Sequence, residues 1–207
     1  MSVKTIAGFL LSLSFCVASG DLKAAGRVGE VDEWAKVFAE QVCASCHGAH
    51  GSSKLSEIPS LAAQSQVYLV AKLEQFRNQA LKRPNRHIDL LGITLNDEAT
   101  VEALAQYFAK QPPPPPVTRD ATAVAAGSKI FSDGIETKGI AACSVCHGTN
   151  AEGFWIVPRL AGQHARYVER QLKAIQLQLR DAPGMHAMVK DLSLEEIKAV
   201  AAFIQSK

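Results

Sequence analysis

One six-residue pattern occurs twice in this chain, and the residues around it are duplicated as well. CASCHG occupies residues 43–48 and CSVCHG occupies residues 143–148. Two further pairs of blocks match in the same order, 58–73 with 157–172 and 101–108 with 197–204. Three matched blocks in one order indicate an internal duplication of about 90–100 residues. The duplication predicts two similar folded units instead of one continuous core.

A run of five prolines separates the two copies. Pro112 to Pro116 cannot continue a helix and favour the extended polyproline conformation, which acts as a semi-rigid spacer. We therefore expect a first domain over residues 27–111, a Pro-rich linker over 112–120 and a second domain over 121–207.

Apolar residues recur three or four positions apart in both copies, which predicts an all-α fold. In the first copy the segments 31–42, 68–80 and 101–108 each carry one apolar face. In the second copy Ser193 and Glu196 have the spacing of a capping box, followed by a helical pattern to residue 204. Units this small are short of core, so a bulky buried cofactor would help to stabilise each one.

Residues 1–20 predict a secretory signal peptide whose cleavage site is approximate. Lys4 precedes the apolar run 6–18, and the small residues Ser19 and Gly20 follow it. The run is shorter than the roughly 20 apolar residues that a transmembrane helix needs. We expect a periplasmic protein without a transmembrane span, which leaves peripheral association with a membrane open. The net charge of +2 without runs of like charge argues against a nucleic-acid partner.

The two Cys-x-x-Cys pairs allow three interpretations. A thioredoxin-like redox pair needs a βαβ context, which the helical pattern does not supply. A zinc site needs four ligands close together, whereas the two pairs are about 100 residues apart. The third interpretation is covalent haem attachment at Cys-x-x-Cys-His, and two such matches in an exported protein favour it. Two haem c groups would then be bound by Cys43, Cys46, Cys143 and Cys146, with His47 and His147 as iron ligands.

Each iron needs a sixth ligand or stays open. The second copy offers Met185 and Met188 shortly before its last helix, and thioether ligation raises a haem reduction potential. Both methionines could instead only pack against the haem, since methionine often fills gaps in a core.

In combination, these motifs resemble the dihaem cytochromes c4, which consist of two class I cytochrome c domains in one periplasmic chain. The cytochrome subunit of flavocytochrome c sulfide dehydrogenases is similar. The resemblance covers the CxxCHG motifs, the Pro-x-Leu-Ala-x-Gln blocks and the last helix. It implies electron transfer from a donor dehydrogenase to an acceptor such as a terminal oxidase or another cytochrome. It also implies that the Pro59 and Pro158 carbonyls hold the proximal histidines, and that Met185, seven residues before Leu192, is the ligand.

The first copy departs from that pattern because it has no methionine. The equivalent window is 86–89, and His87 is the one good iron ligand in it. Lys82 is a weaker candidate, because an amine must lose its proton to bind a metal, and an open iron is the remaining alternative. Imidazole favours the ferric state, so we predict a lower potential for the first haem, with electrons entering there and leaving from the second domain.

A redox enzyme is the competing class. An open or labile first iron would permit peroxidase-like chemistry or a subunit role in a sulfur-compound dehydrogenase. Thiosulfate dehydrogenases are similar in architecture but use a Cys-ligated iron, and every cysteine after residue 20 is already assigned to haem attachment. The sequence therefore favours an electron carrier over an enzyme.

Overall fold

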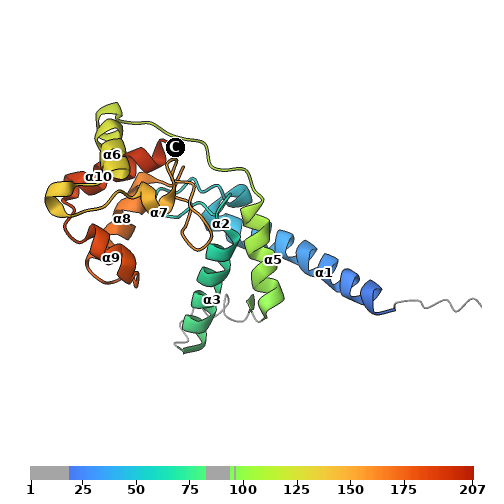
Figure 1. Ribbon diagram of the computed structural model, residues 1–207. Helices are drawn as coiled ribbons and strands as arrows, with labels where there is room; N and C mark the ends of the chain where they lie inside the picture. Colours follow the sequence, from blue (N-terminus) through green and yellow to red (C-terminus); the bar gives the residue numbers. More distant parts are fainter. Residues whose placement is uncertain (1–18, 83–93, 96) are drawn as a thin grey trace, which may run out of the picture.

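The helices of this protein form two groups joined by a long extended segment (Figure 1). The computed structural model describes residues 19–82, 94–95 and 97–207. Within these ranges the ordered structure is helical, with two isolated β-bridges and no β-sheet. The predicted all-α class is confirmed.

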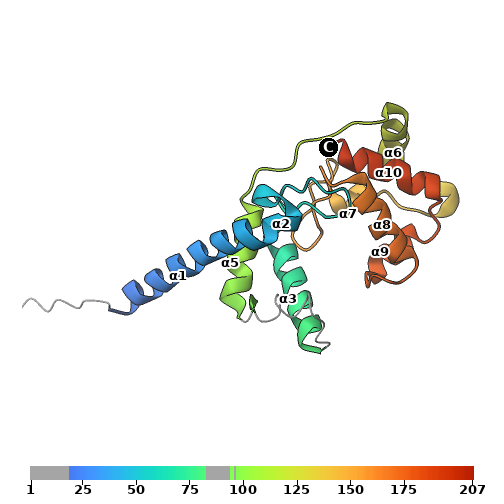
Figure 2. The same ribbon diagram turned by 180° about the vertical axis from the view of Figure 1, so that it is seen from behind.

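The first group is built around the helix that leads into the first cysteine motif. Helix α1 (Ser19–Phe38) continues through a π-helical turn, η1 (Ala39–Cys43), into the single-turn helix α2 (Ala44–His47). After the short 3-10 helix η2 (Ala49–Gly51) come α3 (Gln66–Lys82) and α5 (Glu98–Ala109). The N-terminal part of α1 projects away from the other helices (Figures 1 and 2).

The core of the first group is buried on α1, α3 and α5. Its members include Ala35, Ala39, Leu69, Leu95, Val101, Leu104 and Phe108. On α1 the buried positions are the two small alanines, whereas Trp34 and Val42 are 38% and 48% exposed. The apolar face predicted over 31–42 is therefore only partly buried, because α5 meets α1 along its alanine side.

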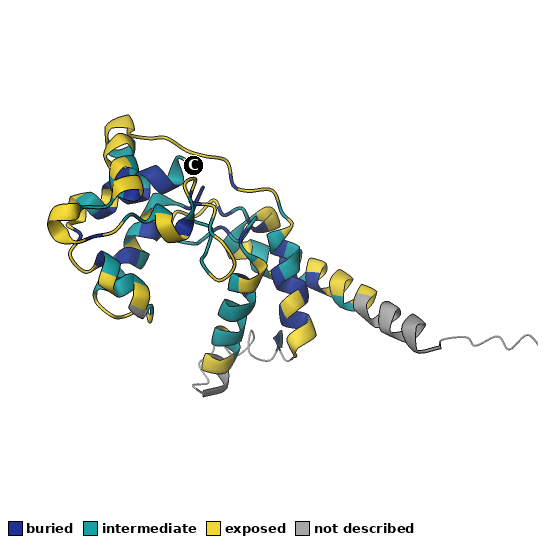
Figure 3. Cartoon of the chain, viewed as in Figure 1, coloured by how far each residue is buried: buried dark blue, intermediate teal, exposed yellow. Residues whose placement is uncertain are grey.

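The second group comprises α6 (Ala121–Asp133), the 3-10 helix η3 (Glu136–Lys138), α7 (Ser144–His147), α8 (Ala165–Gln176), α9 (Pro183–Val189) and α10 (Leu194–Gln205). Buried residues concentrate on α10, as they do on α5 (Figure 3). Helix α10 packs closely on α6 at Gly127, where an added Cβ would lie 1.9 Å from the Ala199 carbonyl oxygen. The capping box of Ser193 and Glu196 is present at the start of α10 and confirms that prediction.

The Pro-rich segment lies against the second group. Pro114 is buried, and a Cβ on Gly162 would approach the Pro114 carbonyl oxygen to 3.0 Å. The Val117 N–H donates to the Gln205 carbonyl oxygen over 2.9 Å. The segment is extended, as five prolines require, and it is docked along its length.

In the part of the chain that the structure describes, no helix is long and apolar enough to cross a membrane. Residues 1–18 of the predicted signal peptide lie outside that part, so the signal peptide stays a prediction.

Candidate haem sites

Each cysteine motif forms one helical turn that ends in a glycine with positive φ. Gly48 has φ 77°, and a Cβ there would lie 2.0 Å from the Ser52 carbonyl oxygen. Gly148 has φ 79°, and a Cβ there would lie 2.4 Å from the Glu152 carboxyl group. Only glycine fits this backbone without strain, which explains why the repeated pattern is CxxCHG and not merely CxxCH.

Both motif histidines are held by a proline carbonyl. His47 Nδ1 lies 2.8 Å from the Pro59 carbonyl oxygen, and His147 Nδ1 lies 3.0 Å from the Pro158 carbonyl oxygen. A carbonyl only accepts, so Nδ1 carries the proton and Nε2 keeps a free lone pair. Burial lowers the pKa of each imidazole, and the proline carbonyl partly opposes that shift. The hydrogen bonds implied by the resemblance are thus present, and they prepare a neutral imidazole for a metal.

The four motif cysteines are free thiols in this structure. Burial raises the pKa of Cys43 to about 11 and also raises the pKa of Cys143. Cys-x-x-Cys redox pairs depend on a thiol pKa below the usual range, so the environment contradicts a thioredoxin-like role. Across the described ranges there is no cluster of three or more His, Cys, Asp or Glu side chains that could hold a metal ion. A zinc site therefore finds no support.

Met185 and Met188 lie on α9, and both pack against the second core beside Leu172 and Ile175. His186 stands between them, but its two ring nitrogens are engaged. Its Nδ1 lies 2.9 Å from the Ile175 carbonyl oxygen and its Nε2 lies 3.2 Å from Gln178 Nε2. The thioethers remain the uncommitted ligands of this helix.

His87 lies within residues 83–93, outside the described part of the chain, and the side chain of Lys82 is also not described. The first-domain ligand therefore stays a prediction. His50 belongs to the loop directly after the first motif, where its Nδ1 lies 3.4 Å from the Tyr107 hydroxyl.

The residues present fit haem c. Each site combines two cysteines in one turn with an adjacent neutral imidazole. In addition, Arg159 Nε is buried without a hydrogen-bond partner among the described residues, directly after the proline that holds His147. A buried guanidinium N–H needs an anionic partner, and haem carries two propionate groups that could serve.

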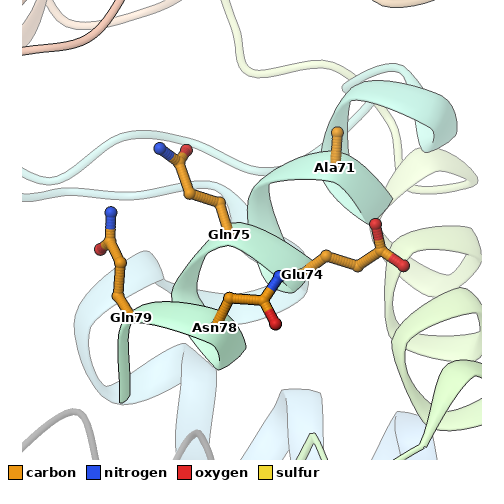
Figure 4. Close-up of a pocket in the computed structure, with 5 residues that line it drawn as sticks. All are labelled: Ala71, Glu74, Gln75, Asn78 and Gln79. Carbon is orange, nitrogen blue, oxygen red and sulfur yellow. The ribbon is translucent and has the colours of Figure 1, made fainter. Parts of the chain in front are cut away.

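A surface pocket lies along α3, apart from either cysteine motif (Figure 4). Ala71, Glu74, Gln75, Asn78 and Gln79 line it, all from this one helix. No cysteine, histidine or methionine takes part, so this pocket has no role in the argument for haem.

The two domains meet through a pair of glutamines that the sequence did not single out as functional. Gln64 of the first domain bonds to the backbone of Arg159, and Gln163 of the second bonds to the backbone of Ser60. Both side chains are buried. The signal available in the sequence was a glutamine kept at the same place in two otherwise apolar repeats.

Charged and aromatic groups complete the domain interface. Arg180 Nη2 donates to the Tyr68 hydroxyl over 3.0 Å, and His164 Nε2 lies 2.9 Å from the Ser53 carbonyl oxygen. Glu57 of the first domain pairs with Arg166 and Arg170 of α8. The first site and the second site are therefore joined by direct contacts between their own loops.

Comparison with known proteins identifies the class. The Cytochrome c family matches residues 31–111 and again residues 124–207. The chain therefore belongs to the cytochrome c family and contains two of its domains.

The particular group follows from relatives that span both domains. A cytochrome c4 of Thiocapsa roseopersicina is 32% identical over 192 residues, covering 90% of this chain and 97% of that protein. The crystal structure of reduced recombinant cytochrome c4 from Pseudomonas stutzeri matches with a TM-score of 0.75 and 27% identity, covering 84% of this chain and 97% of that one. A protein of Thiomonas intermedia (strain K12) called thiosulfate dehydrogenase electron acceptor is 34% identical over 183 residues, covering 84% of this chain and 82% of its own length. The chain is thus a dihaem electron-transfer protein similar to cytochromes c4, and its cofactors are two covalently attached haem c groups.

Proposed function

We propose that this protein is a periplasmic electron carrier whose two haems differ in potential. Cys43 and Cys46 attach the first haem, and Cys143 and Cys146 attach the second. His47 and His147 are the proximal ligands. Met185 completes the second iron and His87 the first. Electrons enter from a donor dehydrogenase at the first domain and leave from the second to a terminal oxidase or another cytochrome.

The observation that carries the proposal is the shared geometry of His47 and His147. Each imidazole is fixed by a proline carbonyl at 2.8 or 3.0 Å, with Nε2 free. Such a hydrogen bond orients a metal-bound histidine and raises its basicity. The same arrangement in both domains supports two low-reorganisation iron sites, as electron transfer requires.

Bound haem c supplies one-electron chemistry at its iron. The chain's own residues keep that iron in one geometry. The carbonyls of Pro59 and Pro158 hold the imidazole rings. The packing of Met185 and Met188 against the second core excludes water from that side. The contacts from Gln64 and Gln163 keep the two sites together, so electrons pass between them without crossing solvent.

A spectroelectrochemical titration of the haem-loaded protein tests the proposal. We expect two one-electron steps, with the Met–iron band of the oxidised protein belonging only to the step at higher potential. Two indistinguishable potentials, or a Met–iron band at both steps, would contradict unequal ligation. Purified protein from the periplasmic fraction of the native cell tests the location.

The donor is proposed to be a sulfur-compound dehydrogenase, on the strength of the relative called thiosulfate dehydrogenase electron acceptor. Stopped-flow mixing with a thiosulfate dehydrogenase and thiosulfate should reduce both haems. Mixing without the dehydrogenase should reduce neither. Reduction by thiosulfate alone would instead favour an enzyme.

An open first iron is the alternative that such an enzyme would need. Binding of carbon monoxide to the reduced protein separates the two possibilities, because an iron with both axial ligands binds it slowly and weakly. Rapid, stoichiometric binding at one haem would support peroxidase-like or dehydrogenase chemistry at the first domain.

A further inference from the structure

The peptide group that holds each proximal histidine is shared with the opposite domain. The carbonyl oxygen of the Pro59–Ser60 peptide accepts from His47 Nδ1 at 2.8 Å. The N–H of that same peptide donates to Gln163 Oε1 at 3.0 Å. One rigid planar unit therefore connects the histidine of the first domain to a glutamine of the second.

The arrangement is reciprocal. The carbonyl oxygen of the Pro158–Arg159 peptide accepts from His147 Nδ1 at 3.0 Å. Its N–H donates to Gln64 Oε1 at 2.7 Å. The two glutamines occupy matching places in the repeat, so the duplication has produced two crossed connections of the same kind.

Each glutamine is fixed by a second bond. Gln163 Nε2 donates to the Ser60 carbonyl oxygen at 2.6 Å, and Gln64 Nε2 donates to the Arg159 carbonyl oxygen at 2.8 Å. Gln163 and Ser60 are only 8% and 2% exposed, and Gln64 is 6% exposed. The bonds therefore lie in a low-dielectric interior, where water competes weakly and each bond is electrostatically stronger.

Hydrogen bonds arranged in a chain polarise one another. A glutamine oxygen that accepts from the peptide N–H increases the basicity of the carbonyl oxygen on the same peptide. That oxygen then pulls more strongly on the histidine Nδ1–H, and Nε2 becomes a stronger donor to iron. A stronger imidazole donor stabilises the ferric state and lowers the reduction potential.

From this geometry we propose that Gln163 and Gln64 are positioning residues that act across the domain interface. Gln163 strengthens the proximal ligand of the first haem, and Gln64 strengthens that of the second. The proposal rests on ligation of the two irons by His47 and His147, and it is independent of the sixth ligands. The potential of each haem thus depends on the docking of the other domain.

The test uses the haem-loaded protein with Gln163→Leu and, separately, Gln64→Leu, which keep side-chain bulk and remove both bonds. The first readout is the Nδ1–H resonance of each haem-bound histidine in the reduced, histidine-labelled protein, assigned through contacts to Pro59 or Pro158. We expect Gln163→Leu to move the His47 resonance toward that of a weaker hydrogen bond and to leave that of His147 in place. Gln64→Leu should do the reverse.

The second readout is the reduction potential of each haem. Loss of one glutamine should raise the potential of the haem in the opposite domain by the equivalent of about a threefold change in its ferric–ferrous equilibrium. Gln163→Asn, whose shorter amide cannot make both contacts, is the second variant if Gln163→Leu loads poorly. It should reproduce the direction of the shift.

Glu57→Gln is the matched control, because it weakens a domain contact without touching either shared peptide. Shifts at the haem of the substituted domain, equal shifts at both haems, or the same shifts in Glu57→Gln would overturn the proposal. Unchanged resonances in both glutamine variants would also overturn it. A failure of the assignment of Met185 or His87 would appear in the spectrum of the unsubstituted protein and would leave the crossed histidine shifts intact.

Discussion

The two domains build the same proximal half of a haem site and differ in what surrounds it. Both have one helical turn, a glycine at positive φ, and a histidine bound to a proline carbonyl. The first domain reaches its first cysteine through a π-helical turn, whereas the second reaches it through a loop closed by the Ile135–Ile140 bridge. The second domain also has methionines packed on its core. The shared parts attach haem, and the parts that differ are free to give each haem its own potential.

The largest expected effect comes from exchanging the ligand that distinguishes the domains. His87→Met should raise the potential of the first haem by a substantial part of the roughly 0.8 V range that axial ligands span. Its oxidised spectrum should gain a second Met–iron band. His50→Gln is the matched control, since His50 lies in a first-domain loop beside Tyr107 and should leave the spectrum unchanged. An unchanged spectrum in His87→Met would place the first-domain ligand elsewhere.

Helix packing gives the next effect, because the contact at Gly127 leaves no room for a side chain. Gly127→Ala would push a Cβ to within 1.9 Å of the Ala199 carbonyl oxygen and should destabilise the second domain by about 1–3 kcal/mol. Chemical denaturation of the haem-loaded protein measures this. Gly29→Ala is the control on α1, where nothing lies within 4 Å of the new Cβ. Equal losses in the two variants would contradict the assigned cause.

Helix capping tests whether the last helices of the two domains are held alike. Ser193 accepts from Glu196 N–H at the start of α10, and Asp97 accepts from Thr100 N–H at the start of α5. Ser193→Ala and Asp97→Ala should each lower the free energy of unfolding by about 0.5–2 kcal/mol. Ser193→Ala should cost more, because Glu196 also returns a bond to the Ser193 N–H. A larger loss at Asp97 would reverse the comparison.

The smallest effect is expected from the ion pairs between the domains. The hydrogen bond from Arg166, together with the charges of Arg166 and Arg170, holds the pKa of Glu57 below its usual range, against a small opposing contribution from desolvation. These contacts are therefore present above the ordinary glutamate pKa and are lost as the pH falls through the lowered value. Glu57→Gln should lower thermal stability slightly at neutral pH and low salt. The difference from the unsubstituted protein should vanish in acid and at high salt. A difference that persists in acid would assign Glu57 another role.

Much of the fold and the site followed from local pattern. The duplication, the all-α class, the capping box of Ser193 and the proline carbonyls at His47 and His147 were all expected and are present. Helical periodicity was less reliable on α1, where Trp34 is more exposed than Ala35 because the approach of α5 decides which side is buried. Gly127 showed no local signal either, since its need for a missing side chain arises only where α10 crosses α6.

The sequence by itself determined the chemistry of this protein. Covalent attachment depends on residues within five positions of one another, so two CxxCHG motifs suffice to specify two haem c groups. Only the tertiary structure decided how the two sites are joined. Gln163 lies 103 residues from Ser60, and Gln64 lies 95 residues from Arg159. Contacts over such separations depend on how two complete surfaces dock, because the buried polar groups of each domain must find partners on the other. The sequence contains both glutamines, but only the docked domains show that each reaches the histidine peptide of the other.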